Sequence, residues 1–165
     1  MTLSGSADHL AEDLNRYSPA VSRAYSAAGA TLRPRLGEAE LREWADAGLR
    51  IARNAFRTWE SAIEYFQASP AVLDRLGFAK TMRWAAFGRD LSNDSAVIAS
   101  AYFRASPGVL RHLAAGQVEE WGWIGRNLYQ GNWKSGELAA RFYEASPGLL
   151  ETLGARELGY LARLC

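Results

Sequence analysis

Ala68-Ser69-Pro70 returns as Ala105-Ser106-Pro107 and again as Ala145-Ser146-Pro147, each time inside a longer matching frame. An aromatic pair stands four and five residues before each proline, and leucine follows three and six residues after it. The aromatic pairs are Tyr65-Phe66, Tyr102-Phe103 and Phe142-Tyr143. A frame that recurs at this length indicates a chain built from repeated units.

Tryptophan and glycine extend the frame on its C-terminal side, fourteen and eighteen residues after the first two prolines. Trp44 and Gly48 have the same spacing, which places a fourth copy earlier in the chain. The repeat anchors are therefore Ala30, Pro70, Pro107 and Pro147, at steps of 40, 37 and 40 residues. Such a period is typical of stacked helical units, each of which buries its apolar face against its neighbours.

Serine followed by proline favours the start of a helix, because the hydroxyl can accept from a free amide and proline has no amide to satisfy. The sequence therefore predicts a short helix from Pro70 to Leu76, with counterparts after Pro107 and Pro147. Gly77, Gly116 and Gly154 are expected to mark the ends of these short helices. From Glu38 the apolar pattern is that of a long helix around Trp44, and longer helices should also lie around the other frame tryptophans. The glycine four residues after each tryptophan lies on the same helical face, which favours a packing role at the close approach of a neighbouring helix. The predicted fold class is all-α, a right-handed α-solenoid of about four three-helix units with a period of 37–40 residues.

Residues 1–165 are expected to form a single helical-repeat domain with atypical ends. Residues 1–37 are interpreted as a degenerate N-terminal cap. The last unit is incomplete, because the frame puts Leu161 in the place of tryptophan and Cys165 in the place of glycine. An apolar stripe with no following unit predicts either a longer protein or a contact with another subunit through this end.

The period and the expected helix count resemble those of armadillo-like and HEAT-like repeats, over about residues 25–165. The motif also resembles helical repeats found ahead of von Willebrand factor A modules in bacterial proteins that act with MoxR-type ATPases. That resemblance implies a scaffold or regulatory module coupled to an ATPase. The metal-binding Asp-x-Ser-x-Ser of such a module is not matched, because residues 90–94 read Asp-Leu-Ser-Asn-Asp.

Composition argues against several other classes of protein. Apolar residues make up 48% of the chain, which favours a packed core, and the formal net charge of +1 gives no global case for nucleic acid or an anionic membrane. No apolar run approaches the roughly 20 residues that span a bilayer, so the expected location is cytoplasmic. Neither histidine has a second nearby in sequence, and the one cysteine is terminal. We expect no cofactor, no metal and no catalytic site.

Polar residues on the long helices are the candidate binding residues. Arginine stands five residues after two of the frame tryptophans, each time followed by Asp or Asn, and three further arginines share one helical face in the first long helix. The candidates are Arg50, Arg53, Arg57, Arg89, Asp90, Arg126 and Asn127. They would form a basic ridge for an acidic protein segment, or a solvated face paired with local acids. A protein partner is the first hypothesis; a HEAT-like stack on nucleic acid is the second, disfavoured by only two lysines, and an unrecognised enzyme is the third.

Overall fold

The computed structural model describes residues 4–54, 59–131 and 135–154, and over these ranges the protein is all-α, with eight helices and no strand. The helices are α1 (Ser4–Tyr17), α2 (Pro19–Leu32), α3 (Glu38–Ala52), α4 (Trp59–Leu76), α5 (Phe78–Asp94), α6 (Ala96–Val109), α7 (Ala115–Gly131) and α8 (Gly136–Leu153). The all-α class that the periodicity predicts is confirmed.

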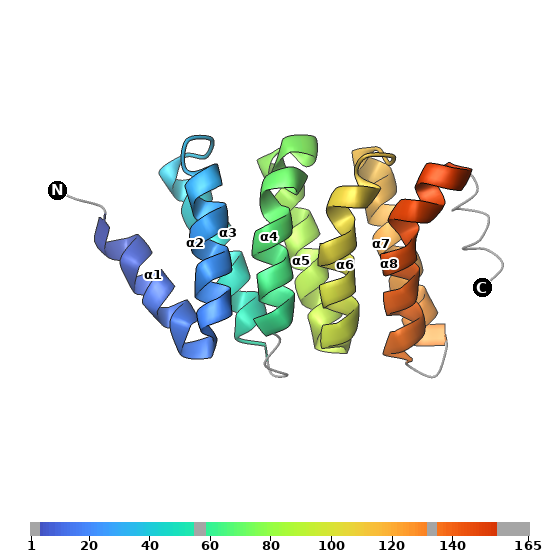
Figure 1. Ribbon diagram of the computed structural model, residues 1–165, viewed down its shortest axis with the longest axis horizontal. Coiled ribbons are helices and arrows are strands. Elements are labelled where there is room, and N and C mark those ends of the chain that lie inside the picture. The colour runs from blue at the N-terminus through green and yellow to red at the C-terminus, as the bar shows by residue number, and fades with distance from the viewer. Residues whose placement is uncertain (1–3, 55–58, 132–134, 155–165) are drawn as a thin grey trace.

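The helices lie in two layers (Figure 1). Helices α2, α4, α6 and α8 stand side by side in one layer and contact one another in that order, while α3, α5 and α7 form the second layer behind them. Helix α1 packs against α2 and α3 at the N-terminal end. Each frame tryptophan lies in the second layer and each aromatic pair in the first, so the core forms between the layers.

The prediction that short helices start at the Ser-Pro steps is wrong. Pro70, Pro107 and Pro147 lie inside α4, α6 and α8, which run through them without interruption. One frame interval therefore holds two helices in the described residues, not three. A proline inside a helix costs about 3 kcal/mol, and burial of apolar residues on both sides of it, such as Phe66 and Val72, offsets that cost.

The serine before each proline has a different role from the helix cap that the sequence predicts. Ser69 donates its hydroxyl to the carbonyl of Tyr65, one turn earlier in the same helix, at 2.5 Å. Ser106 does the same to Tyr102 at 2.7 Å. All three frame serines are fully buried. Burial of a hydroxyl costs free energy unless the hydroxyl is hydrogen-bonded, and these bonds to the preceding turn reduce that cost.

The rings of the frame form a continuous stack through the core. Tyr25 stacks on Trp44 at 5.6 Å between centroids, and Tyr65 stacks on Trp84 at the same distance. In each case the tyrosine lies 19 residues before the tryptophan, within the same copy of the frame. Burial raises the pKa of Tyr65 above its ordinary range, so the phenol stays protonated and donates to the carbonyl of Trp44 at 2.9 Å. The stack therefore couples each helix pair to the next.

The glycine four residues after each frame tryptophan is required by packing, as its position predicts. A Cβ on Gly48 would overlap the ring of Phe66, and one on Gly88 would overlap the ring of Phe103. The close approach is made by an aromatic side chain from the other layer, not by the backbone of a neighbouring helix. An alanine at these positions would force the facing ring to shift.

The helix ends follow the sequence at two glycines but not at a third. Gly77 and Gly154 follow the last residues of α4 and α8 with φ of 72° and 82°, a conformation that favours glycine, so the predicted stops there are confirmed. Gly116, expected to mark a stop, is the second residue of α7. The predictions for Leu161 and Cys165 concern positions outside the described residues.

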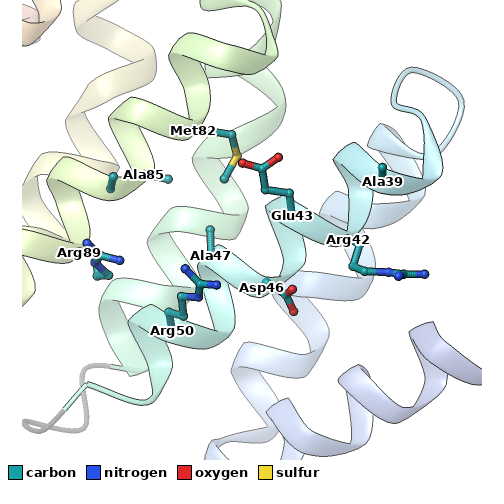
Figure 2. Close-up of a pocket in the computed structure, with 10 residues that line it drawn as sticks. Ala39, Arg42, Glu43, Asp46, Ala47, Arg50, Met82, Ala85 and Arg89 are labelled. Atoms are coloured by element: carbon teal, nitrogen blue, oxygen red, sulfur yellow. The ribbon is translucent and has the colours of Figure 1, made fainter.

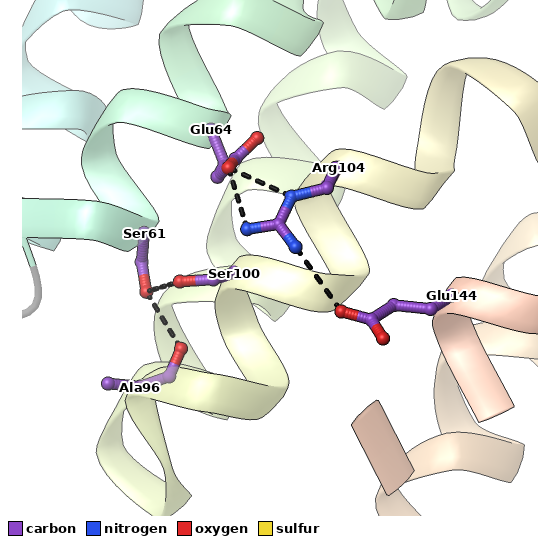
Figure 3. A network of polar contacts seen from close by, with 6 residues as sticks. All are labelled: Ser61, Glu64, Ala96, Ser100, Arg104 and Glu144. Carbon is purple, nitrogen blue, oxygen red and sulfur yellow. Dashed lines mark hydrogen bonds and ion pairs between the residues drawn. The ribbon is translucent and has the colours of Figure 1, made fainter. Parts of the chain in front are cut away.

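Three helices of the first layer share a polar link on their exposed face (Figure 3). Arg104 of α6 bonds Glu64 of α4 at 2.8 and 2.9 Å and Glu144 of α8 at 3.2 Å. The bond to Glu64 raises the pKa of the Arg104 guanidinium further. Nearby, the buried hydroxyls of Ser61 and Ser100 join α4 to α6 at 3.0 Å. These bonds fix the register of neighbouring helices.

Candidate functional site

A groove of about 420 Å³ separates α3 from α5 in the second layer (Figure 2). Its lining residues are Ala39, Arg42, Glu43, Asp46, Ala47, Arg50, Met82, Ala85, Ala86 and Arg89. Four of the ten are alanines, so little side-chain volume fills the space between the two helices. The groove combines an apolar lining with charged side chains at its edges, the composition of a site that fixes a ligand by shape and orients it by charge.

Two of the predicted binding residues meet in this groove. Arg50 of α3 and Arg89 of α5 lie at the same end, and Glu43 and Met82 lie towards the other end (Figure 2). Arg50 is exposed, and its side chain forms no hydrogen bond or ion pair to another described residue. Arg89 pairs with Asp90 beside it at 3.2 Å, with 41% of its side chain exposed. This end of the groove can therefore accept a carboxylate.

Arg53, another of the predicted arginines, does not line this groove. Arg53 turns towards α1, where it donates to the hydroxyl of Tyr17 at 3.0 Å and pairs with Asp13 at 3.7 Å. Arg57 lies outside the described residues. The structure therefore places Arg53 against α1, a helix that the local pattern does not include, while Arg50 lines the α3–α5 groove.

Arg126 and Asn127, the candidates on α7, also lie away from the α3–α5 groove. Arg126 donates to the carboxylate of Asp94 at 2.9 Å and lies 5.4 Å from the centre of the Trp123 ring. Its side chain is 20% exposed, and its ion pair with Asp94 joins α7 to α5 within the second layer. Asn127 is exposed. Asp90 faces the next groove rather than this one.

A second groove, of about 290 Å³, runs between α5 and α7. It includes Trp123, which is 45% exposed although it is one of the largest apolar side chains in the protein. Sequence reasoning missed this residue because it lies two positions after the frame tryptophan, where the other units have Asp46 and Ala86. The sequence signal that could have identified Trp123 is that a large aromatic residue stands where the other units have a small or polar one.

A third hollow, of about 570 Å³, lies between α2 and α4 in the first layer. Its lining contains one charged side chain, Arg23, among small and apolar residues. With one charge it offers few groups to orient a ligand. The α3–α5 groove, with five charged residues in its lining, is the better candidate site.

The described residues contain no group of three or more His, Cys, Asp or Glu side chains placed to hold a metal ion. Within the same part of the chain, no helix is both long and apolar enough to cross a lipid bilayer. Comparison with known protein families, curated proteins and solved structures found no match.

Proposed function

We propose that this chain is a non-catalytic protein-binding module, a right-handed α-solenoid of repeated helical units in the manner of armadillo and HEAT repeats, acting in the cytoplasm. The observation that carries the proposal is the groove between α3 and α5, which has Arg50 and Arg89 at one end and alanines among its lining residues. In such a module, equivalent helices present one extended surface, and a partner segment lies across it.

The groove is supported by a rigid core, which favours binding without rearrangement. Trp44 of α3 and Trp84 of α5 are 1% and 4% exposed and pack against the buried aromatic rings of the first layer. A groove whose walls are held in this way loses little conformational entropy when it is occupied. The same support would keep the two arginines at a fixed separation.

The partner we propose is an acidic protein segment. Arg50 and Arg89 supply two positive charges at one end of the groove, and Arg42 is paired with Glu38 on its own helix at 3.2 Å. Binding to nucleic acid is less well supported, because Glu43 and Asp46 line the same groove and would repel a continuous run of phosphates, whereas a protein segment can place single carboxylates at the Arg50 and Arg89 end alone. Coupling to an ATPase is proposed only from the resemblance of the repeat motif.

The test is selection from a random-peptide library displayed on phage, with the purified chain as bait, followed by fluorescence anisotropy on the selected peptides. We expect enrichment of acidic peptides. The double variant R50E/R89E should weaken their binding at least tenfold, since each replaced side chain turns an attraction into a repulsion.

A matched control is R75E/R111E, which changes the net charge equally at two exposed arginines that line none of the three grooves. This variant should bind the selected peptides within about twofold of the unmodified chain. Equal weakening by both variants would show only a general charge effect and would contradict the proposed site. Binding of duplex DNA in preference to every selected peptide would favour the nucleic-acid alternative.

A further inference from the structure

The α3–α5 and α5–α7 grooves are built from the same positions of the repeat frame. The residue three after the frame tryptophan is Ala47 in α3 and Phe87 in α5, and these residues line the near wall of the first and second groove. The residue two after the tryptophan is Ala86 in α5 and Trp123 in α7. One groove therefore has two alanines where the other has two aromatic side chains.

In the α5–α7 groove the two aromatic side chains fill the space between the helices. The rings of Phe87 and Trp123 meet edge to face, 5.3 Å apart between centroids. Gly122 makes room for Phe87, because a Cβ there would lie 2.9 Å from the ring. The α3–α5 groove has Ala85 at the position of Gly122 and no ring at either aromatic position.

The volumes agree with this comparison. The α3–α5 groove measures about 420 Å³ and the α5–α7 groove about 290 Å³. The backbones of α3 and α5 nevertheless contact each other more extensively than those of α5 and α7. Closer packing of the helices therefore does not remove the space that the missing rings leave.

The charged residues at the ends of the two grooves also differ at equivalent positions of the repeat frame. The residue six after the frame tryptophan is Arg50 in the first groove and Asp90 in the second. The residue five after it is Arg89 on the facing wall of the first groove and Arg126 on the facing helix of the second. The second groove thus contains a carboxylate at a position where the first has a guanidinium.

We propose that the α3–α5 groove binds an aromatic side chain of the partner, seated over Ala47 and Ala86, with an adjacent carboxylate held by Arg50 and Arg89. This inference rests on the proposed protein-binding function and names the ligand chemistry. The partner would supply the ring that the chain itself supplies in the next groove. It would also supply a carboxylate for Arg50, which lies at the same end of the groove as Arg89. An aromatic ring gives a large apolar contact at a small cost in conformational entropy.

The probes are N-acetyltryptophan, which has a ring and a carboxylate, N-acetyltryptophanamide, which lacks the carboxylate, and N-acetylleucine, which lacks the ring. Binding is followed by backbone amide shifts in two-dimensional NMR of the full chain. We expect saturable shifts at Ala47, Ala86 and Arg50 with N-acetyltryptophan, with a Kd on the order of a millimolar. The amide should bind about three- to tenfold more weakly, and N-acetylleucine more weakly still.

Two variants test the two halves of the site. A47F/A86W restores the internal aromatic pair and should abolish the shifts caused by N-acetyltryptophan, provided that its thermal melt stays cooperative. R50A/R89A keeps the apolar space and should bind N-acetyltryptophan no more tightly than the amide. If A47F/A86W does not fold, the comparison of the three probes and R50A/R89A still decides the question.

The proposal is overturned if N-acetyltryptophan shifts no groove residue, if N-acetylleucine binds as well as N-acetyltryptophan, or if R50A/R89A binds the acid and the amide as the unmodified chain does. Its failure is separable from that of the proposed function. Library peptides that depend on Arg50 and Arg89 but contain no aromatic residue would retain the function and reject this ligand. Probe binding without any selected peptide would retain the site and reject protein binding.

Discussion

The indole Nε1 of Trp84 in α5 donates a buried hydrogen bond of 2.8 Å to the Oγ of Ser106 in α6. That hydroxyl donates in turn to a carbonyl of its own helix, so one serine links the two layers. Trp121 and Ser146 repeat the arrangement at 2.9 Å. The serine before the proline is thus part of the interface between helices, not a local signal for a helix start.

Ser106→Ala should lower the free energy of unfolding by about 1–3 kcal/mol, because it leaves the Trp84 Nε1 buried without an acceptor. Trp84→Ala should cost about 3–5 kcal/mol, since it also removes a large buried ring. Urea denaturation measures both.

The control is Trp44, whose buried Nε1 has no hydrogen-bond partner among the described residues. Trp44→Phe should therefore cost less than Trp84→Phe, and equal costs would contradict the role of the serine.

Gly88→Ala should destabilise the protein by about 1–3 kcal/mol, because the new Cβ would overlap the ring of Phe103 and force it to move. Gly148 provides the matched control inside α8, since a Cβ there meets nothing within 4 Å. Gly148→Ala should stabilise the protein by about 0.5–1 kcal/mol through helix propensity. Melting temperatures of the two variants should move in opposite directions. A loss at both positions would argue against packing as the reason for Gly88.

Stability should fall above about pH 10, the ordinary pKa of tyrosine. Burial raises the pKa of Tyr65, Tyr102 and Tyr143 above that value, so each phenol is neutral in the folded chain and ionises more easily when unfolded. The contribution is fully present below about pH 10 and is lost as pH rises through the folded pKa, by about 1.4 kcal/mol per pH unit for each tyrosine.

Urea denaturation at several pH values between about 9 and 11 checks the sign and the slope. Tyr65→Phe removes one ionisable group along with its bond to the Trp44 carbonyl. This variant should be less stable at neutral pH but should show a shallower decline above about pH 10. A decline equally steep in the variant and the unmodified chain would show that Tyr65 does not titrate in this way.

Arg104→Gln should cost about 0.5–1 kcal/mol at low ionic strength, because it breaks pairs to two neighbouring helices through a side chain that is half exposed. The cost should shrink in high salt. Arg141 is the control, since it pairs with Glu137 on its own helix and both side chains are 74% exposed. Arg141→Gln should change the melting temperature less than Arg104→Gln does, at the same salt concentration.

The sequence by itself determined the helical class, the frame of the core and several helix ends. Glu38 begins α3, and Gly77 follows the end of α4, as the local pattern predicts. The spacing of tryptophan and glycine also predicts a packing role for Gly48 and Gly88, which the structure confirms. These features depend on periodicity and on the conformational preferences of single residues. Both are determined by residues that are close together in the sequence.

The tertiary structure alone decided what the Ser-Pro steps do. Ser18-Pro19 begins a helix, with the serine accepting from the amide of Ala20, whereas Ser69-Pro70 lies inside α4. The local chemistry of the two dipeptides is the same. The difference is burial: the residues on both sides of Pro70 pack into one core, and that gain exceeds the cost of a lost helical hydrogen bond.

The candidate site also required the tertiary structure. Helical spacing placed Arg50 with Arg53 and Arg57, but the fold places Arg50 beside Arg89, 39 residues later, and turns Arg53 towards Asp13. Spacing within one helix fixes which residues share a face, and it carries no information on which other helix meets that face. The helix that packs against that face is determined by the burial of rings such as Trp44 and Trp84 between the layers. This burial depends on residues from the whole chain.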